Sequence, residues 1–298
     1  MKYLSVSEIA KRWGLSERSV RNYCALGKID GAFLTGKTWN IPEDAQKPDR
    51  ANKNKTMPTT LLEVLKAERS AHLSGGIYHF VQIELTYNSN NMEGSRLSHD
   101  QTRYIFETNT IGFEGGVVKA DDIVETANYF CCVDMIIDAA SRPISESFIK
   151  ELHRTLKNGT TDSRKIWFEV GNYKKYPNTV GGMDTAQPDE VAVKMHHLLK
   201  EYNSIQEKTL DDLLDFHYRF ESIHPFQDGN GRIGRLLLFK ECLKQNIVPF
   251  IIDEELKLFY YRGLHEWSRK RGYLRDTCLA AQDKFRKQLD YFKIRYET

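Results

Sequence analysis

Residues 224–235 read His224-Pro225-Phe226-Gln227-Asp228-Gly229-Asn230-Gly231-Arg232-Ile233-Gly234-Arg235, and this stretch decides the fold around it. A helical pattern leads in from Leu210 to Ile223, and Pro225 disfavours helical backbone at His224. Apolar and charged residues return at helical spacing from Arg232 onward. The segment Asp228 to Gly231 is therefore predicted to be a loop that leads into the N-terminus of a second helix.

The residues of this loop suit a phosphorylated ligand. Glycines let a ligand approach the backbone closely, and the free N–H groups of a helix N-terminus bind anions. Arg232 and Arg235 lie three residues apart, so they share a helix face and can both reach phosphate oxygens. Asp228 suits magnesium, which takes one or two protein carboxylates plus substrate phosphates. His224, with an ordinary pKa of about 6.5, can act as a base at neutral pH. Together these residues predict phosphoryl or nucleotidyl transfer.

The pattern H-P-F-x-D-G-N-G-R-x-x-R resembles the signature of the Fic family, whose usual activity is the transfer of AMP from ATP to a protein hydroxyl. The resemblance implies a general base at His224 and a magnesium ligand at Asp228. It also implies that Arg235 pairs with the γ-phosphate. The phosphate-binding loop would consist of Gly229, Asn230, Gly231 and Arg232. The related Doc-type kinases carry Ala and Lys where this chain has Gly229 and Gly231, and this difference favours AMP transfer.

The resemblance extends outside the loop. Asp122 to Tyr129 and Phe148 to His153 resemble two earlier helices of the family. Lys175 to Gly182 would form the β-hairpin flap that positions the target side chain by strand-like pairing. Lys174, where the family often has Arg, is a departure to which we assign no role. Tyr261, in a late helix, would lie near the adenine.

A second motif lies upstream. Ser89-Asn90-Asn91-Met92-Glu93-Gly94 is similar to the [S/T]-x-x-x-E-[G/N] inhibitory motif of Fic proteins. Ser89 and Glu93 lie one helical turn apart and face the same way. The resemblance implies that Glu93 competes for Arg235, so that ATP binds in a non-productive pose. In some family members the same Glu activates water to remove AMP.

Hydrophobic periodicity predicts that residues 59–298 form an all-α bundle. The family resemblance implies that this bundle is of the Fic type. A small β-hairpin flap is predicted at residues 165–182. The predicted helices span Leu61 to His72, Ile77 to Asn90, His99 to Asn109, Ala120 to Ala139, Ser145 to Lys157, Glu190 to Tyr202, Leu210 to Ile223 and Asp276 to Tyr296, with the helix from Arg232 and one around Tyr261.

Residues 1–50 are predicted to form a separate small domain, joined by a linker at residues 51–58 that is rich in Lys and Asn. Ser5 and Glu8 have capping-box spacing for a first helix that ends at Gly14. Ser16 starts a second helix, and short extended pieces follow. The arrangement resembles a winged helix-turn-helix of the excisionase or MerR-like type. Its predicted DNA contacts are Arg18, Ser19, Arg21, Asn22 and Lys37.

Residues 1–55 hold eleven Lys and Arg against six Asp and Glu. This excess of positive charge suits contacts between the module and nucleic-acid phosphates. Two alternatives stay open: a helix-turn-helix that docks protein, and a solvated basic face. The whole-chain net charge of +2 does not separate these alternatives from DNA binding. The chain has five cysteines without metal-type spacing, no apolar run long enough for a membrane span and no signal peptide, so a cytoplasmic protein is expected.

The function predicted from the sequence is magnesium-dependent transfer of AMP from ATP to a Ser, Thr or Tyr hydroxyl of a protein, with the chain itself as one candidate target. Glu93 would restrain this activity. Duplex DNA bound through residues 1–50 and a homodimer are further expected partners. Two alternatives remain: a nucleotide-sensing DNA-binding regulator with little transfer activity, and an enzyme that removes AMP or uses another phosphate donor.

Overall fold

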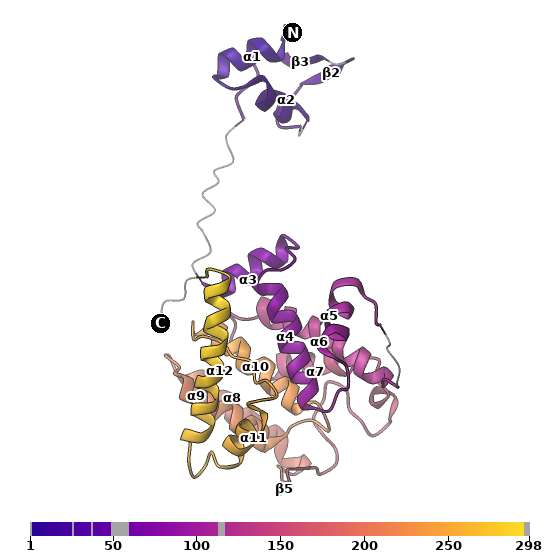
Figure 1. The fold of residues 1–298 in the computed structure, drawn as a ribbon, viewed down its shortest axis with the longest axis vertical. Coiled ribbons are helices and arrows are strands. Elements are labelled where there is room, and N and C mark those ends of the chain that lie inside the picture. The colour runs from indigo at the N-terminus through magenta and orange to yellow at the C-terminus, as the bar shows by residue number, and fades with distance from the viewer. Residues whose placement is uncertain (1, 26, 37, 49–59, 113–116, 295–298) are drawn as a thin grey trace. The chain divides into compact units, whose positions relative to one another are not determined.

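The computed structural model describes residues 2–25, 27–36, 38–48, 60–112 and 117–294 of the 298-residue chain. The chain divides into two compact units, Met1–Met57 and Pro58–Thr298 (Figure 1). Within the described residues, every helix is too short or too polar to cross a lipid bilayer. The predicted linker at residues 51–58 and the predicted DNA contact Lys37 lie outside the described residues.

The N-terminal unit combines two helices with a three-stranded antiparallel sheet of order β1-β3-β2. Its elements are β1 (Tyr3–Leu4), α1 (Val6–Trp13), α2 (Glu17–Ala25), β2 (Phe33–Thr35) and β3 (Thr38–Pro42). The predicted capping box is present, because the Ser5 hydroxyl accepts from the Glu8 N–H, and Gly14 ends α1 with a φ of 63°. Ile9, Val20 and Ile41 form the centre of its small core.

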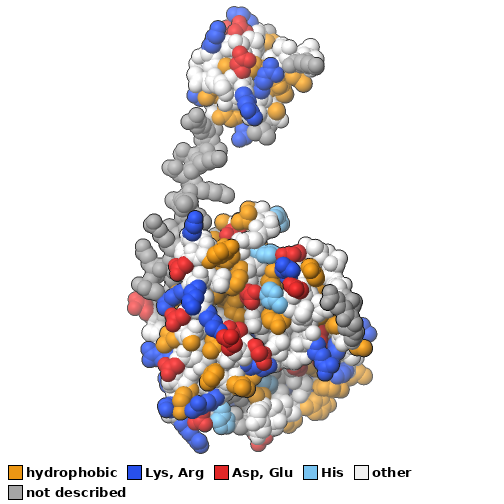
Figure 2. Space-filling view, in the orientation of Figure 1, with side chains coloured by type: hydrophobic (Ala, Val, Ile, Leu, Met, Phe, Trp, Pro, Cys, Tyr) orange, Lys and Arg blue, Asp and Glu red, His pale blue; other side chains and the backbone are white. Residues whose placement is uncertain are grey.

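Helix α2 of this unit presents Arg18, Arg21 and Asn22 to solvent. Ser19 is half-buried, and its hydroxyl lies 2.9 Å from that of Ser16 at the start of the helix. Lys and Arg side chains are prominent on the face of this unit that Figure 2 shows. The larger unit carries intermixed acidic and basic side chains on the same view.

The larger unit is mostly helical, which confirms the predicted class. Its helices are α3 (Leu61–Ser70), α4 (Ile77–Met92), α5 (His99–Thr108), α6 (Ala120–Asp138), α7 (Glu146–Lys157), the 3-10 helix η1 (Asp162–Arg164), α8 (Pro188–Ser204), α9 (Leu210–Ile223), α10 (Asn230–Lys244), α11 (Lys257–His265) and α12 (Gly272–Tyr291). Helix α10 lies at the centre, in contact with α4, α6, α7 and α9.

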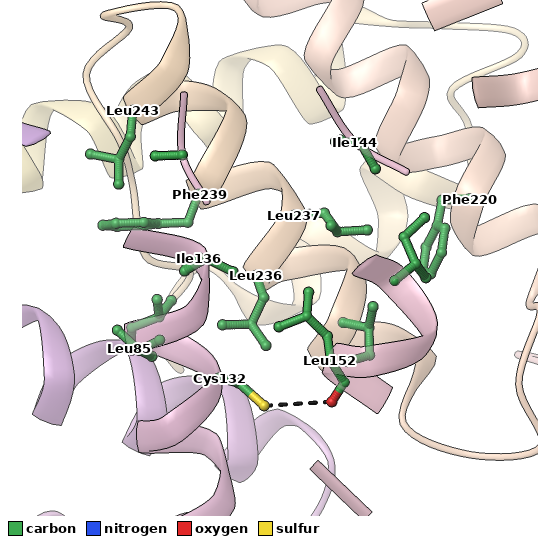
Figure 3. Packing of buried hydrophobic residues seen from close by; sticks show 14 of the residues in the cluster. Leu85, Cys132, Ile136, Ile144, Leu152, Phe220, Leu236, Leu237, Phe239 and Leu243 are labelled. Carbon is green, nitrogen blue, oxygen red and sulfur yellow. Dashed lines mark hydrogen bonds between the residues drawn. The ribbon is translucent and has the colours of Figure 1, made fainter. Parts of the chain in front are cut away.

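The core of the larger unit is built around α10. Leu236, Leu237 and Phe239 of α10 pack against Leu85 of α4 and Ile136 of α6 (Figure 3). All of these side chains are buried, and full burial of one such side chain contributes roughly 1.5–3 kcal/mol. Because α10 is surrounded on all sides, its first turn is held in a fixed position.

The junction between α9 and α10 follows the sequence closely. Helix α9 ends at Ile223, and His224 takes the left-handed conformation with a φ of 52°. Helix α10 begins at Asn230, two residues before the predicted start at Arg232. The reason is Gly229, whose φ of 83° turns the chain in a single residue, so Asn230 and Gly231 belong to the helix and not to the loop.

The predicted hairpin exists, but its predicted bounds of 165–182 are wrong. The two strands are β4 (Thr179–Val180) and β5 (Met183–Asp184), which pair antiparallel. Gly181 and Gly182 both have positive φ and form the two-residue turn between the strands. The expectation placed this glycine pair at the end of the hairpin, whereas it is the turn.

Candidate functional site

His224 lies at the end of α9 with its side chain 16% exposed. Nδ1 lies 3.3 Å from the Glu221 carbonyl oxygen, which can only accept, so Nδ1 carries the proton and Nε2 has the free lone pair. Burial lowers the pKa of His224 to about 4, and the nearby charge of Lys174 contributes in the same direction. The imidazole is therefore neutral at pH 7 and able to accept a proton.

Asp228 lies in a cluster of opposite charges. Its Oδ2 accepts from Lys157 Nζ at 2.6 Å and from Arg232 at 3.2 Å. Burial raises the pKa of the Asp228 carboxyl, but Arg232 and Lys157 outweigh burial and lower it to about 2. The carboxyl is ionised throughout the neutral range.

The donor set around Asp228 fits magnesium. Both cationic contacts end on Oδ2, and the side chain is 47% exposed, so the carboxylate has a solvent-facing side. No cluster of three or more His, Cys, Asp or Glu able to hold a metal occurs among the described residues. Magnesium can take a single protein carboxylate and draw its other ligands from substrate phosphates and water.

Lys157, which the sequence analysis missed, is the centre of this cluster. Its side chain is 2% exposed, and its ammonium also pairs with Glu125 and, at 3.1 Å, with Asp162. Glu125 in turn pairs with Arg232. A buried lysine is rare unless it is paired, and this one is paired with three carboxylates. The i, i+4 spacing of His153 and Lys157 on one face of α7 was the available signal.

The loop that carries Asp228 is held from behind by buried groups. His153 accepts from the Gly171 N–H on Nδ1 and lies 3.1 Å from the Asp228 carbonyl through Nε2. Its ring stacks on Phe226 at 3.9 Å between centroids. The Asn230 amide brackets Phe226, accepting from its N–H and donating to its carbonyl. The Asn230 side chain is thus engaged by the loop, and its backbone N–H remains for an anion.

Arg235 is buried and already has partners. It donates to the Ser89 hydroxyl at 2.9 Å, to the Ser89 carbonyl at 3.0 Å and to the Glu93 carboxylate at 2.7 Å. A Cβ on Gly231 would lie 2.4 Å from Glu93 Oε1, so this glycine makes room for the carboxylate. The two motifs predicted from separate parts of the chain therefore meet at one place.

Tyr261 lies beside the same contact. Its hydroxyl donates to the Met92 carbonyl at 3.2 Å, directly before Glu93. Its side chain is 39% exposed. In this structure Tyr261 connects α11 to the end of α4.

Lys174 connects the β4–β5 hairpin to the loop that follows His224. Its backbone N–H donates to Pro225, and its ammonium donates to Asn178 and Thr185, each at 2.6 Å. Asn178 and Thr185 bracket the β4–β5 hairpin. Burial lowers the Lys174 pKa to about 8, with a further contribution from the charge of Lys194.

The structure thus brings together the candidate residues of the larger unit. The charges of Glu93 and Asp228 both act on the pKa of His224. The candidate base His224, the candidate metal ligand Asp228 and the Glu93–Arg235 contact therefore lie close enough to interact electrostatically. The candidates Arg18, Ser19, Arg21 and Asn22 belong to the other unit.

Comparison with known proteins agrees with this geometry. Residues 143–241 match the Fic/DOC family. The chain is 26% identical over 274 residues to the protein adenylyltransferase Fic of Drosophila yakuba, covering 86% of this chain and 53% of that protein. The chain thus spans about half the length of the curated relatives it matches.

Solved structures share the fold. A Fic domain containing signaling protein from Bacteroides thetaiotaomicron aligns with a TM-score of 0.62 at 25% identity, covering 80% of this chain and 98% of that one. Fic-1 from C. elegans aligns with a TM-score of 0.60 at 20% identity, covering 78% and 72%. The matched segment contains His224, Asp228 and Arg235, so these candidate residues lie in the part of the chain that is similar to the Fic/DOC family.

Proposed function

We propose that this chain is an enzyme that transfers AMP from ATP to a hydroxyl side chain of a protein. One observation carries the proposal: a neutral imidazole, an ionised carboxylate and two guanidinium groups gather at the first turn of α10. The family match and the relatives named protein adenylyltransferase support the same reaction class.

In the proposed reaction, Nε2 of His224 takes the proton of the target hydroxyl. The hydroxyl oxygen bonds to the α-phosphorus, the bond from that phosphorus to the bridging oxygen breaks, and pyrophosphate leaves. The N–H groups of the first turn of α10 and Arg232 hold phosphate oxygens, and Arg235 orients the γ-phosphate. Magnesium, when bound at Asp228, would supply positive charge to the phosphates.

Glu93 is proposed as a brake on this reaction. Its carboxylate occupies Arg235 at 2.7 Å, and one guanidinium cannot serve a carboxylate and a γ-phosphate at the same time. The Glu93 charge also acts on His224, which suits activation of a water molecule that would hydrolyse an AMP-modified hydroxyl and release AMP and the free hydroxyl. The contact between Glu93 and Arg235 favours AMP transfer as the activity that Glu93 restrains. AMP removal is the alternative.

The N-terminal unit is proposed as a DNA-binding head of the winged helix-turn-helix type. The exposed Arg18, Arg21 and Asn22 on α2 support this. We further propose that the target hydroxyl belongs to a Ser, Thr or Tyr side chain and that the chain also modifies itself. A homodimer is the proposed assembly.

The test uses the full chain with magnesium and ATP labelled at the α-phosphate, alongside His224→Ala and Glu93→Gly variants. We expect label on protein that is lost in the first variant and increased in the second. Label on bound nucleotide alone would support a sensor, and label transferred from γ-labelled ATP would indicate a kinase. If Glu93→Gly binds ATP but labels no protein, added or its own, the proposal is wrong.

A further inference from the structure

Glu221 lies on α9, one turn before His224, and has no role so far. Its side chain is 14% exposed. Oε2 lies 4.0 Å from His224 Nδ1, on the side of the ring opposite the lone pair of Nε2. Oε1 is buried and has no hydrogen-bond partner within the described part of the chain. A buried unpaired oxygen is unfavourable, so its retention calls for a reason.

The neighbouring helix is shaped to admit this carboxyl. A Cβ on Gly234 would lie 2.2 Å from Glu221 Oε1, so any side chain there would displace it. Gly231, one turn earlier on the same face of α10, admits Glu93 in the same way. Two glycines of the motif thus receive two carboxyl groups, one at Arg235 and one behind the imidazole.

Charged and titratable groups near Glu221 come from α9, α10, α11 and the end of α4. Burial raises the Glu221 pKa to about 8; the charge of Arg235 opposes this and that of Glu93 adds to it. Lys174 acts on His224 from the flap. The other titratable groups nearby are His217 on α9 and Tyr260 and Tyr261 on α11. With the His224 pKa lowered to about 4, the imidazole is neutral across the neutral range, while the raised pKa of Glu221 favours a protonated carboxyl up to about pH 8.

We propose that Glu221 is a positioning residue for His224: its carboxyl is held in the recess over Gly234, behind the imidazole, where it stabilises the imidazolium. Its catalytic role rests on the proposed AMP transfer. When Nε2 takes the hydroxyl proton, the ring keeps its Nδ1 proton and becomes positive. An ionised carboxylate 4.0 Å behind the ring stabilises that charge, whereas a protonated one does not. Transfer should therefore become faster as Glu221 ionises.

The kinetic test compares Glu221→Gln with its parent, both carrying Glu93→Gly so that the brake is absent. Glutamine keeps the shape and fills the recess but cannot ionise. At a pH where Glu221 is ionised, we expect kcat for AMP transfer to fall about 10–100-fold, with KM for ATP within about twofold, since the change acts through a residue that touches the reacting proton. The parent rate should rise with pH through the carboxyl titration, and the variant should lack that rise. An unchanged kcat and pH profile would overturn the proposal.

A second readout does not depend on activity. NMR of the full chain with labelled histidine reports the His224 tautomer and titration. We expect the His224 signal to move with pH through the Glu221 carboxyl titration in the parent and in Glu201→Gln, a matched substitution at a 61% exposed side chain on α8, and to lack that movement in Glu221→Gln. The tautomer, which the backbone carbonyl of residue 221 sets, should stay the same in all three proteins. The same pH dependence of the His224 signal in Glu221→Gln and in the parent would contradict an interaction between Glu221 and His224, whether or not the chain transfers AMP. If Glu221→Gln does not fold, Gly234→Ala, which evicts the carboxyl, should produce the same changes.

Discussion

Arg235 donates to the carboxylate of Glu93 at 2.7 Å, which joins the first turn of α10 to the end of α4. A hydrogen bond to a charged group contributes roughly 1.5–3 kcal/mol. For Arg235 to face a phosphate, this bond must first be given up. Replacement by Glu93→Gly should therefore raise the rate of AMP transfer and self-modification by about ten- to a hundredfold. Label from α-labelled ATP measures it.

Glu93→Asp is the control for this prediction, because it keeps the charge but shortens the side chain. It should give a rate between the parent and Glu93→Gly. Equal rates in all three proteins would show that the contact with Arg235 does not limit transfer.

Lys157 should stabilise the fold much more than a surface lysine with the same partner. Lys157 and Lys165 both pair with Asp162, but their side chains are 2% and 41% exposed. Lys157→Met removes the buried ammonium from Glu125 and Asp228, which keep only Arg232, and breaking such a buried pair costs roughly 3–5 kcal/mol. Lys165→Met should cost below about 1 kcal/mol. Urea unfolding measures both, and similar losses would contradict the burial argument.

Stability should fall on mild acidification. Burial lowers the pKa of His153 and of His217 to about 3 each, and burial with Lys174 lowers that of His224 to about 4. Between the unfolded pKa of about 6.5 and these values, the unfolded chain binds more protons, so the stability present above pH 6.5 is lost as pH falls. Each group contributes a slope of up to about 1.4 kcal/mol per pH unit.

His217→Leu tests this assignment by removing one of the three groups. The slope of unfolding free energy against pH should become shallower between pH 6.5 and 4, whatever happens to the absolute stability. His265→Gln, at a 56% exposed side chain, should leave the slope as it was. A steep slope that survives His217→Leu would exclude that histidine as a source.

The local features of the fold were predictable from the sequence. Pro225 ends α9 because it disfavours helical backbone at the residue before it, and His224 is indeed non-helical. The serine and threonine caps and the apolar periodicity similarly locate most helix ends. Gly181 and Gly182 also carried a usable signal, since two adjacent glycines between short strands indicate the tight turn that the structure shows.

The long-range features were not predictable from local pattern. Beyond its i, i+4 spacing from His153, the sequence near Lys157 does not separate it from a surface lysine, because its burial depends on carboxylates from other segments. Glu221 equally looks like an ordinary helix residue until Gly234 of the next helix is placed against it. The contact of Glu93 with Arg235 was expected only from the family resemblance, since the two residues are remote in the chain.

The DNA-binding proposal predicts a specific loss of charge-dependent affinity. Arg18 and Arg21 are exposed on α2, where they can reach phosphates. The double variant Arg18→Ala and Arg21→Ala in the full chain should bind duplex DNA more weakly. The slope of log affinity against log salt should become shallower by about 1.8, since each phosphate contact contributes about 0.9.

A double variant of equal charge separates this effect from net charge alone. Lys200→Ala and Lys287→Ala remove two exposed positive charges from the larger unit. If α2 makes the contacts, this variant should keep the parent affinity within about twofold and the parent salt slope, because it removes no phosphate contact. Equal losses in the two double variants would indicate attraction by overall charge. Absence of duplex binding by the parent at low salt would remove the DNA-binding head from the proposal and leave the transfer chemistry of the larger unit untouched.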